Sequence, residues 1–306
     1  MLDIAKNLKN NKATSSNISS KILTTQKTLK NPVKLTGIGL HSGVNVNLLI
    51  NPAPTGYGIS FRRVDVGNFD NVIQANFKNV TKTQLGTTIS NSEGTMVSTV
   101  EHLMAALWGC GVDNALIDID NAEVPIMDGS SKVFVDAISK IGVKEQTEQR
   151  RVLRVVSEVR VDEDDKYAIL KPSNDFSIDL EIDFATKAIS NQKRIFSASQ
   201  AEFNSVLADA RTFGFEHEVE YMRKNGLAIG GSLDNAVVIS GDKVLNKGGL
   251  RYDDEFVRHK LLDCIGDFYL AGRRIAGSVV AYKSGHTLNN KLLHKLFSTR
   301  EAYEIV

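Results

Sequence analysis

The chain has 306 residues, a formal net charge of +1 at pH 7, and an ordinary globular balance of 42% hydrophobic and 24% charged residues. This length accommodates two domains of common size. Because the charge is close to zero, no global field attracts nucleic acid or an anionic membrane, and we expect neither as a partner. No apolar run reaches the roughly 18 residues that a membrane span needs, and the N-terminus has no apolar signal core, so we expect a cytoplasmic protein.

Residues 1–28 are rich in Lys, Asn, Ser and Thr. Such a stretch buries too little apolar surface to fold, so we predict a disordered N-terminal extension and ordered structure from near Val33. The two cysteines, Cys110 and Cys264, lie in apolar helical patterns. We expect them to be buried free thiols, which excludes a disulfide framework and fits a reducing compartment.

A first α+β domain is predicted over residues 29–147. Alternating apolar and polar residues predict strands at Val44–Ile50 and Ile59–Arg63. Further along, the pattern predicts a helix, a strand and a second helix, at Ser98–Trp108, Ala115–Asp120 and Ser130–Ile141. The polar segment Val143–Arg151 separates two apolar regions, and we place the domain boundary there.

The second half, residues 148–306, repeats this order. Strands predicted at Leu153–Val161 and Phe176–Phe184 precede a helix, a strand and a helix at Glu255–Leu270, Ile275–Tyr282 and Leu288–Phe297. Strand runs before helix pairs predict an α+β fold of two similar domains, each a mostly antiparallel sheet with helices on one face. Two such domains facing each other form a seam, where ligand sites tend to occur.

The first predicted helix carries an adjacent acid and histidine, Glu101 and His102. Ser98 precedes Glu101 by three residues, so the segment fits a capping box in which the glutamate only satisfies a backbone N–H. A catalytic Glu-His pair is the competing interpretation. The segment alone leaves both open.

The helix predicted at Glu255–Leu270 presents His259, Asp263 and Asp267 on one face, at a spacing of i, i+4 and i+8. A His and an Asp one turn apart either ligate one zinc ion or form an exposed pair worth roughly 0.3 kcal/mol. This helix holds the same place in the second half as the helix with His102 in the first. If the two helices face each other, three protein ligands and one open position result, which is typical of catalytic zinc.

Two more segments hold candidate catalytic residues. His286 follows the turn Lys283–Gly285 after a predicted strand, where it is either an ordinary first residue of a helix or a general acid on a rigid scaffold. Thr212 lies between bulky neighbours in Ala210–Phe215, and a strand threonine is the simpler interpretation.

Seven motifs, in order from about Thr28 to the C-terminus, closely resemble the bacterial UDP-3-O-acyl-N-acetylglucosamine deacetylases. They are GIGLHSG (Gly37–Gly43), STVEHL (Ser98–Leu103), VPIMDGS (Val124–Ser130), ARTFGF (Ala210–Phe215), GGSLDNA (Gly230–Ala236), FVRHKLLDCIGD (Phe256–Asp267) and YKSGHTLNNKLL (Tyr282–Leu293). The resemblance implies a zinc-dependent hydrolase that removes the N-acetyl group from its UDP-sugar substrate and releases acetate. This reaction is the committed step of lipid A synthesis.

The resemblance also implies a role for each matching residue. It places Zn²⁺ on His102, His259 and Asp263, with Glu101 as general base and His286 as general acid.

Two further residues match positions that assist the chemistry. Thr212 falls where a hydroxyl helps the developing oxyanion, and Asp267 matches a residue that supports the catalytic histidine.

The same resemblance implies the substrate contacts. Lys260 and Lys283 match positions that meet the charged nucleotide, and Phe213 lies beside the acyl passage. The segment 214–231 matches an insert that forms the acyl channel. Phe184 matches a uracil contact, although the chain reads Ala-Thr-Lys after it, where family members commonly have His-Pro.

Three other functions share some of these features. A zinc peptidase would need the same ligands but no acyl channel or paired lysines. A metal-free carrier of nucleotide sugars or acyl chains would be expected to have lost at least one of the ligands, the base or the acid. A structural zinc site usually has four protein ligands, and we find no fourth. We expect a monomer whose only partner is the UDP-sugar substrate.

Overall fold

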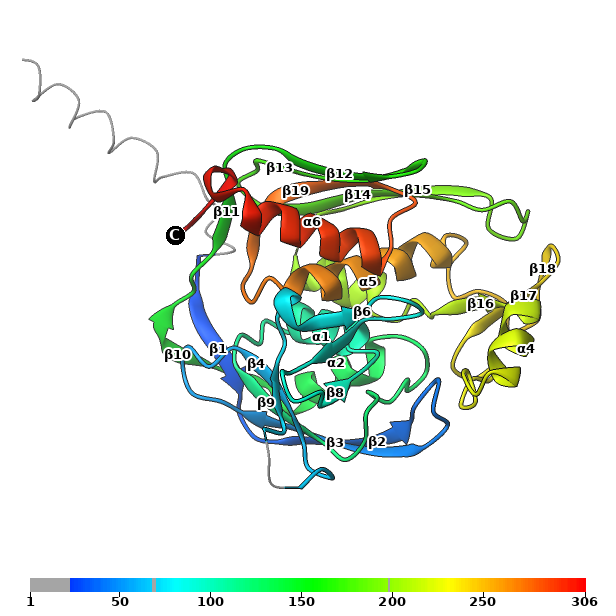
Figure 1. Ribbon diagram of the computed structural model, residues 1–306, viewed down its shortest axis with the longest axis horizontal. Helices are drawn as coiled ribbons and strands as arrows, with labels where there is room; N and C mark the ends of the chain where they lie inside the picture. Colours follow the sequence, from blue (N-terminus) through cyan, green and yellow to red (C-terminus); the bar gives the residue numbers. More distant parts are fainter. Residues whose placement is uncertain (1–22, 68–69, 198) are drawn as a thin grey trace, which may run out of the picture.

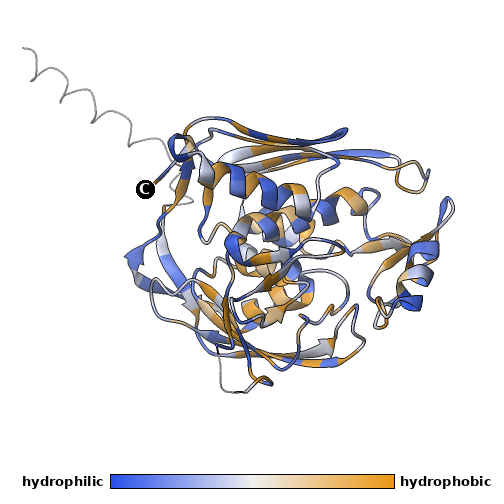
Figure 2. Ribbon diagram, in the orientation of Figure 1, coloured by the Kyte–Doolittle hydropathy of each residue, from blue (hydrophilic) through white to orange (hydrophobic). Residues whose placement is uncertain are grey.

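The computed structural model describes residues 23–67, 70–197 and 199–306. Figure 1 shows two sheets on opposite sides of the molecule, with helices packed between them. The hydrophobic residues of the helices and of the inner sheet faces gather in this middle layer (Figure 2). The fold is α+β, as predicted.

The first half is built on a five-stranded sheet in the order β2-β3-β9-β4-β5. Only β4 and β9 run parallel; the other neighbours are antiparallel. Its strands are β2 (Val33–Ile38), β3 (Asn45–Pro52), β4 (Ile59–Arg63), β5 (Val72–Gln74) and β9 (Ala115–Ile119), and its helices are α1 (Glu101–Gly109) and α2 (Lys132–Ile141). A small sheet of β6 (Val80–Lys82), β7 (Thr88–Ser90) and β8 (Met96–Val97), with the 3-10 turn η2 (Phe77–Asn79), adjoins α1.

The second half is built on a seven-stranded sheet around β19. Helix α5 packs on β14 and β15, and α6 packs on β12 and β13. The strands are β11 (Leu153–Val155), β12 (Val159–Glu163), β13 (Lys166–Lys171), β14 (Phe176–Asp183), β15 (Asn191–Ser197), β19 (Ile275–Tyr282) and β20 (Tyr303–Ile305); the helices are α3 (Gln200–Glu202), α5 (Glu255–Tyr269) and α6 (His286–Ser298). The helical turns η3 (Phe203–Leu207) and η4 (Arg300–Ala302) complete this half.

An insert between η3 and α5 projects to one side (Figure 1). It contains β16 (Phe213–Phe215), α4 (Glu216–Lys224), β17 (Val237–Ser240) and β18 (Lys243–Val244). Gly230 attaches it to the first half, because its N–H donates to the Leu40 carbonyl at 3.0 Å. A Cβ at Gly230 would lie 2.2 Å from the Gly39 oxygen, so only glycine permits this approach.

Helices α1 and α5 cross at the centre of the molecule and join the two halves. Every residue of α1 is buried. Gly266 on α5 allows the close approach, because a Cβ there would lie 2.1 Å from the Glu101 carbonyl oxygen. This crossing brings the polar face of α5 next to Glu101 and His102.

The structure departs from the sequence-based predictions near the predicted boundary between the two domains. Strand β1 (Thr25–Leu29) pairs with β10 (Val143–Gln149), so ordered structure begins by Thr25, earlier than predicted. Most of the polar segment at the predicted boundary is therefore a strand, and the division at residue 147 stays a prediction. The predicted strand Leu153–Val161 is two strands, β11 and β12. The predicted disorder of residues 1–22 lies outside the described residues.

Two smaller observations concern the cysteines and the membrane. Both cysteines are free; Cys264 is buried, and Cys110 is only partly buried. Within the described ranges, no helix has the length and apolar character that crossing a bilayer requires.

Candidate active site

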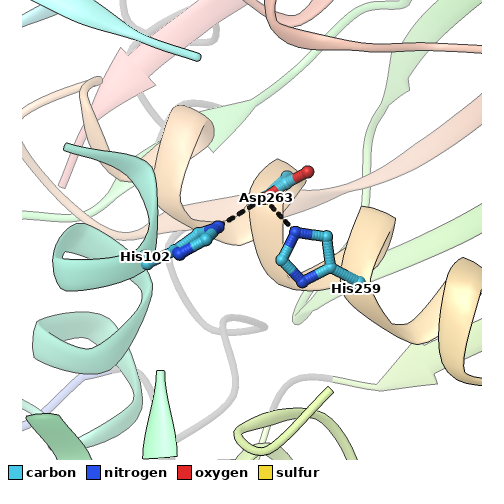
Figure 3. A group of neighbouring side chains, drawn as sticks. All are labelled: His102, His259 and Asp263. Atoms are coloured by element: carbon cyan, nitrogen blue, oxygen red, sulfur yellow. Dashed lines mark ion pairs between the residues drawn. The ribbon is translucent and has the colours of Figure 1, made fainter. Parts of the chain in front are cut away.

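Three buried side chains converge where α1 crosses α5 (Figure 3). His102 comes from α1, while His259 and Asp263 lie one turn apart on α5. Their candidate ligand atoms all lie within 4.8 Å of one another. The Nε2 atoms of His102 and His259 lie 3.4 and 3.3 Å from the same oxygen, Asp263 Oδ1. The structure thus brings together the three residues that the sequence predicts as metal ligands.

The hydrogen bonding of this cluster fits a bound cation. Asp263 Oδ1 is buried and makes no hydrogen bond with any described residue, although such oxygens are normally satisfied. His259 Nδ1 donates to the Ala210 carbonyl at 3.0 Å, which leaves the Nε2 lone pair directed at the cluster. Burial lowers the pKa of His259 to about 4, so the imidazole is neutral, as a metal ligand must be. Two imidazole nitrogens and one carboxylate oxygen are a donor set that suits zinc.

Glu101 faces the same cluster and does not form the capping box. Its Oε2 accepts the backbone N–H of Thr87 at 2.9 Å, and the side chain is 3% exposed. Ser98 instead donates its hydroxyl to the Ala122 carbonyl at 3.1 Å, and the N-cap residue Val100 makes no side-chain cap. The capping-box interpretation is therefore wrong. Burial raises the pKa of the Glu101 carboxyl, against the opposing effect of the positive charge of His286.

His286 begins α6, as predicted, and lies opposite Glu101. Its Nδ1 is 2.8 Å from Asp267 Oδ2, and its Nε2 is 3.9 Å from Glu101 Oε1. Burial alone would lower the pKa of His286, but the negative charges of Asp267 and Glu101 and the hydrogen bond to Asp267 raise it to about 9. His286 is therefore a cation at neutral pH that can donate a proton from Nε2.

Two residues that the sequence analysis missed hold the carboxylates in place. Thr87 is 2% exposed; its backbone N–H donates to Glu101, and its hydroxyl donates to Asp267 Oδ1 at 2.7 Å. Asn289 is fully buried and donates to Asp267 Oδ2 at 2.9 Å. Asn289 lies three residues after His286 on α6, a spacing that could have identified it. Thr87 precedes β7 in a loop, and no periodicity marks it.

Thr212 lies directly before β16 and therefore just outside the strand. Its N–H donates to the Gly129 carbonyl at 2.8 Å, and its carbonyl accepts the N–H of Val237 at 2.8 Å. These two bonds hold Thr212 between the first half and the insert. The residue lines a cavity of about 280 Å³.

Of the predicted substrate-binding residues, Lys260 contacts a metal ligand directly, and Phe213 and Phe184 follow as an aromatic pair. Lys260 Nζ donates to Asp263 Oδ2 at 2.8 Å and lies 5.5 Å from the ring centroid of Phe213. The Phe213 ring is 6.4 Å from the His259 ring and 5.8 Å from the Phe184 ring, centroid to centroid. Phe213 therefore lies between Phe184 and the metal ligand His259.

Lys283 directly follows β19, is partly buried, and is paired with acids. Its Nζ is 2.8 Å from Asp165 Oδ2 and 3.3 Å from Asp183 Oδ2. The hydrogen bond to Asp165, followed by that to Asp183, raises the pKa of Lys283. The side chain would have to leave these partners to meet an anionic ligand.

The cavity beside Thr212 runs along the insert. Its apolar wall comes from both halves of the chain, with Leu40 from the first half and Phe213, Val219, Met222, Ala228 and Val238 from the insert. Glu216, Glu220 and Arg223 supply charge at its edge. The segment 214–231, predicted to form a channel, thus lines an apolar cavity. The cavity wall also includes Phe213, whose ring lies 6.4 Å from that of His259, centroid to centroid.

Comparison with known proteins identifies the family. Residues 26–298 match the model of the UDP-3-O-acyl N-acetylglycosamine deacetylase family. The chain belongs to this family. It is 48% identical over 283 residues to the UDP-3-O-acyl-N-acetylglucosamine deacetylase of Idiomarina loihiensis, 47% to that of Shewanella woodyi and 46% to that of Shewanella frigidimarina. Each comparison covers 92% of this chain and 92% of the relative.

Proposed function

We propose that this protein is a zinc-dependent hydrolase that removes the N-acetyl group from UDP-3-O-acyl-N-acetylglucosamine and releases acetate, the committed step of lipid A synthesis. The observation that carries the proposal is the buried cluster of His102, His259 and Asp263, with a carboxylate and a histidine cation beside it. The shared name of the relatives supports the substrate. A cytoplasmic location and a monomeric state are part of the proposal.

The metal ligands and the acid–base pair divide the chemistry between them. A Zn²⁺ ion held by the three ligands would supply Lewis-acid chemistry to the acetamide carbonyl and to the attacking water. Glu101 takes a proton from that water as the C–O bond forms. His286 gives its Nε2 proton to the glucosamine nitrogen as the C–N bond breaks, so the amine leaves without a negative charge. Asp267 stabilises the imidazolium until that transfer.

The remaining proposed roles follow from position. The Thr212 hydroxyl stabilises the oxyanion that develops on the acetyl oxygen, an effect typically worth about 3 kcal/mol. Lys260, and Lys283 once released from its acids, meet the diphosphate. Phe213 marks the entrance to the acyl channel, and Phe184 contacts the uracil.

Removal of the acyl chain from the substrate should lower kcat/KM steeply. Each buried CH₂ contributes about 0.8 kcal/mol, or roughly fourfold in kcat/KM where burial is complete. We would measure acetate release from the 3-O-acyl substrate, from a series with shorter chains and from UDP-N-acetylglucosamine itself, using the same zinc-loaded enzyme.

Two outcomes of this series contradict different parts of the proposal. Equal kcat/KM for the acylated and unacylated sugars would contradict the acyl-binding role of the cavity and favour a general amidase. If none of these sugars released acetate while stoichiometric zinc was bound, the result would contradict the proposed deacetylase activity and favour a binding protein.

Substitution Thr87→Val should lower kcat while leaving KM and zinc content unchanged. Valine matches the shape of threonine and keeps the backbone N–H to Glu101, but Asp267 loses a buried donor. A hydrogen bond to a charged group is worth about 1.5–3 kcal/mol, so we expect kcat to fall by about tenfold or more if Asp267 no longer orients His286. Thr87→Ser keeps the hydroxyl and should restore most of the rate; a Thr87→Val enzyme with normal kcat would show that this contact does not position the acid.

A further inference from the structure

A second cavity, of about 330 Å³, is lined by four arginines and by none of the residues placed in the reaction above. Arg150 and Arg151 connect β10 to β11, and Arg273 and Arg274 connect α5 to β19. In Figure 1 the β10–β11 connection lies on the opposite side of the view from the insert. We call this cavity the arginine pocket. Residues of the first half, including Gly56 and Asp113, form its other wall.

Two of the four arginines have structural partners. Arg150 Nε lies 2.8 and 2.9 Å from the two carboxylate oxygens of Asp113, and its side chain is almost fully buried. Arg274 donates from Nη2 to the Trp108 carbonyl at 2.6 Å, and its guanidinium carbon lies 4.9 Å from the Trp108 ring centroid. These contacts explain why Arg150 and Arg274 are present without invoking a ligand.

The other two arginines, Arg151 and Arg273, have no such explanation. Neither forms an ion pair or a side-chain hydrogen bond with any residue that the structure describes. Arg273 is half-buried; burial lowers its pKa first, and the positive charge of Arg151 lowers it further. Both arginines line the same cavity, where Arg151 is exposed and Arg273 is half-buried, and their positive charges repel each other there.

The charge of the pocket defines what could neutralise it. Its lining contains four arginines and two acids, Asp113 and Glu148, so the net charge is 4 − 2 = +2. Asp113 is already paired with Arg150, and Glu148 is exposed and remains on the rim. A monocarboxylate would leave one positive charge, whereas a doubly charged phosphate group would balance both.

We propose that the arginine pocket binds a small phosphate-bearing anion, with Arg151 and Arg273 as its ligands. A guanidinium group presents five N–H donors in a planar fork that matches phosphate oxygens in pairs. The pocket volume is at the lower end of the range for small-molecule sites, which suits one or two phosphate groups. A bound anion would connect the start of β11 to the end of α5, the helix that carries His259 and Asp263.

The test is a titration of the full-length protein with inorganic phosphate and with pyrophosphate, followed by thermal unfolding and by the ³¹P NMR linewidth of pyrophosphate. Potassium chloride at matched ionic strength gives the contribution of screening. We expect a saturable rise in Tm with pyrophosphate and phosphate that chloride does not reproduce.

The double variant Arg151→Gln, Arg273→Gln should weaken pyrophosphate binding by tenfold or more, since each arginine provides charge-assisted hydrogen bonds. Its unliganded Tm and its deacetylase activity should stay near those of the wild type, because neither side chain forms an ion pair or a hydrogen bond within residues 23–67, 70–197 and 199–306. Arg160→Gln, an exposed arginine paired with Asp162 on β12, is the matched control and should bind like the wild type. No saturable effect in the wild type, or the same affinity in the double variant, would overturn the proposal without affecting the deacetylase assignment.

Discussion

The variant His259→Ala should lose both its zinc and its activity. Among the residues that the structure describes, three side chains contribute to the cluster. The variant keeps two of them, and zinc sites in enzymes generally require three. Even loss of an outer-shell partner costs about 10–100-fold in metal affinity or activity, and we expect loss of a ligand to cost more than about 10²-fold. Metal content by elemental analysis and acetate release should be measured on the same preparation.

The matched control is His294→Ala, which removes an exposed histidine on α6 whose ring lies 5.0 Å from that of Phe77. This variant should keep full zinc and full activity. Stoichiometric zinc in His259→Ala would show that the ligand set is wrong. Zinc lost with activity retained would contradict the metal-dependent mechanism instead.

Local patterns predicted the elements of the fold well where one face is buried. In β14, the alternation of Phe176, Ile178, Leu180 and Ile182 with polar residues is the pattern of a strand on a core, and the structure confirms it. The pairing of β1 with β10 was not predictable in this way. Most side chains of β10 are exposed, so its composition is that of a linker, and only the long-range backbone pairing makes it a strand.

In the candidate site, too, local sequence patterns predicted some residues, whereas others depend on long-range contacts. The spacing of His259 and Asp263 is a local property of one helix, and sequence reasoning found it. The Ser98–Glu101 capping signature is equally local but misled, because Ser98 bonds across the chain to Ala122. Thr87 has no local signature, because its role depends on two long-range hydrogen bonds, one to Glu101 on α1 and one to Asp267 on α5.

Glu101 and His286 shift each other's pKa in opposite directions. Burial favours the neutral carboxyl at Glu101, whereas the cation at His286 favours the carboxylate. Asp267 and Glu101 in turn favour the cation at His286. Because the two groups interact, they titrate as a coupled pair. The active form has Glu101 ionised and His286 protonated, so kcat/KM should fall at both low and high pH.

The variant Glu101→Gln should lose about 10²–10⁴ in kcat/KM while it keeps its zinc and its fold. Glutamine has the same shape and can still accept the Thr87 N–H through its amide oxygen, so thermal stability should change little. The variant lacks the base, and the acidic limb of the pH profile should therefore disappear. The basic limb remains, because activity is still lost as His286 gives up its proton.

The basic limb also provides a finer test of the contact between the two residues. In the wild type the pKa of about 9 at His286 depends partly on the negative charge of Glu101, 3.9 Å away. The neutral amide removes that contribution, so the residual activity of Glu101→Gln should decline at lower pH than that of the wild type. Asp267→Asn, which removes the other carboxylate, should shift the limb in the same direction. An unchanged basic limb in both variants would mean that a group other than His286 donates the proton to the departing amine.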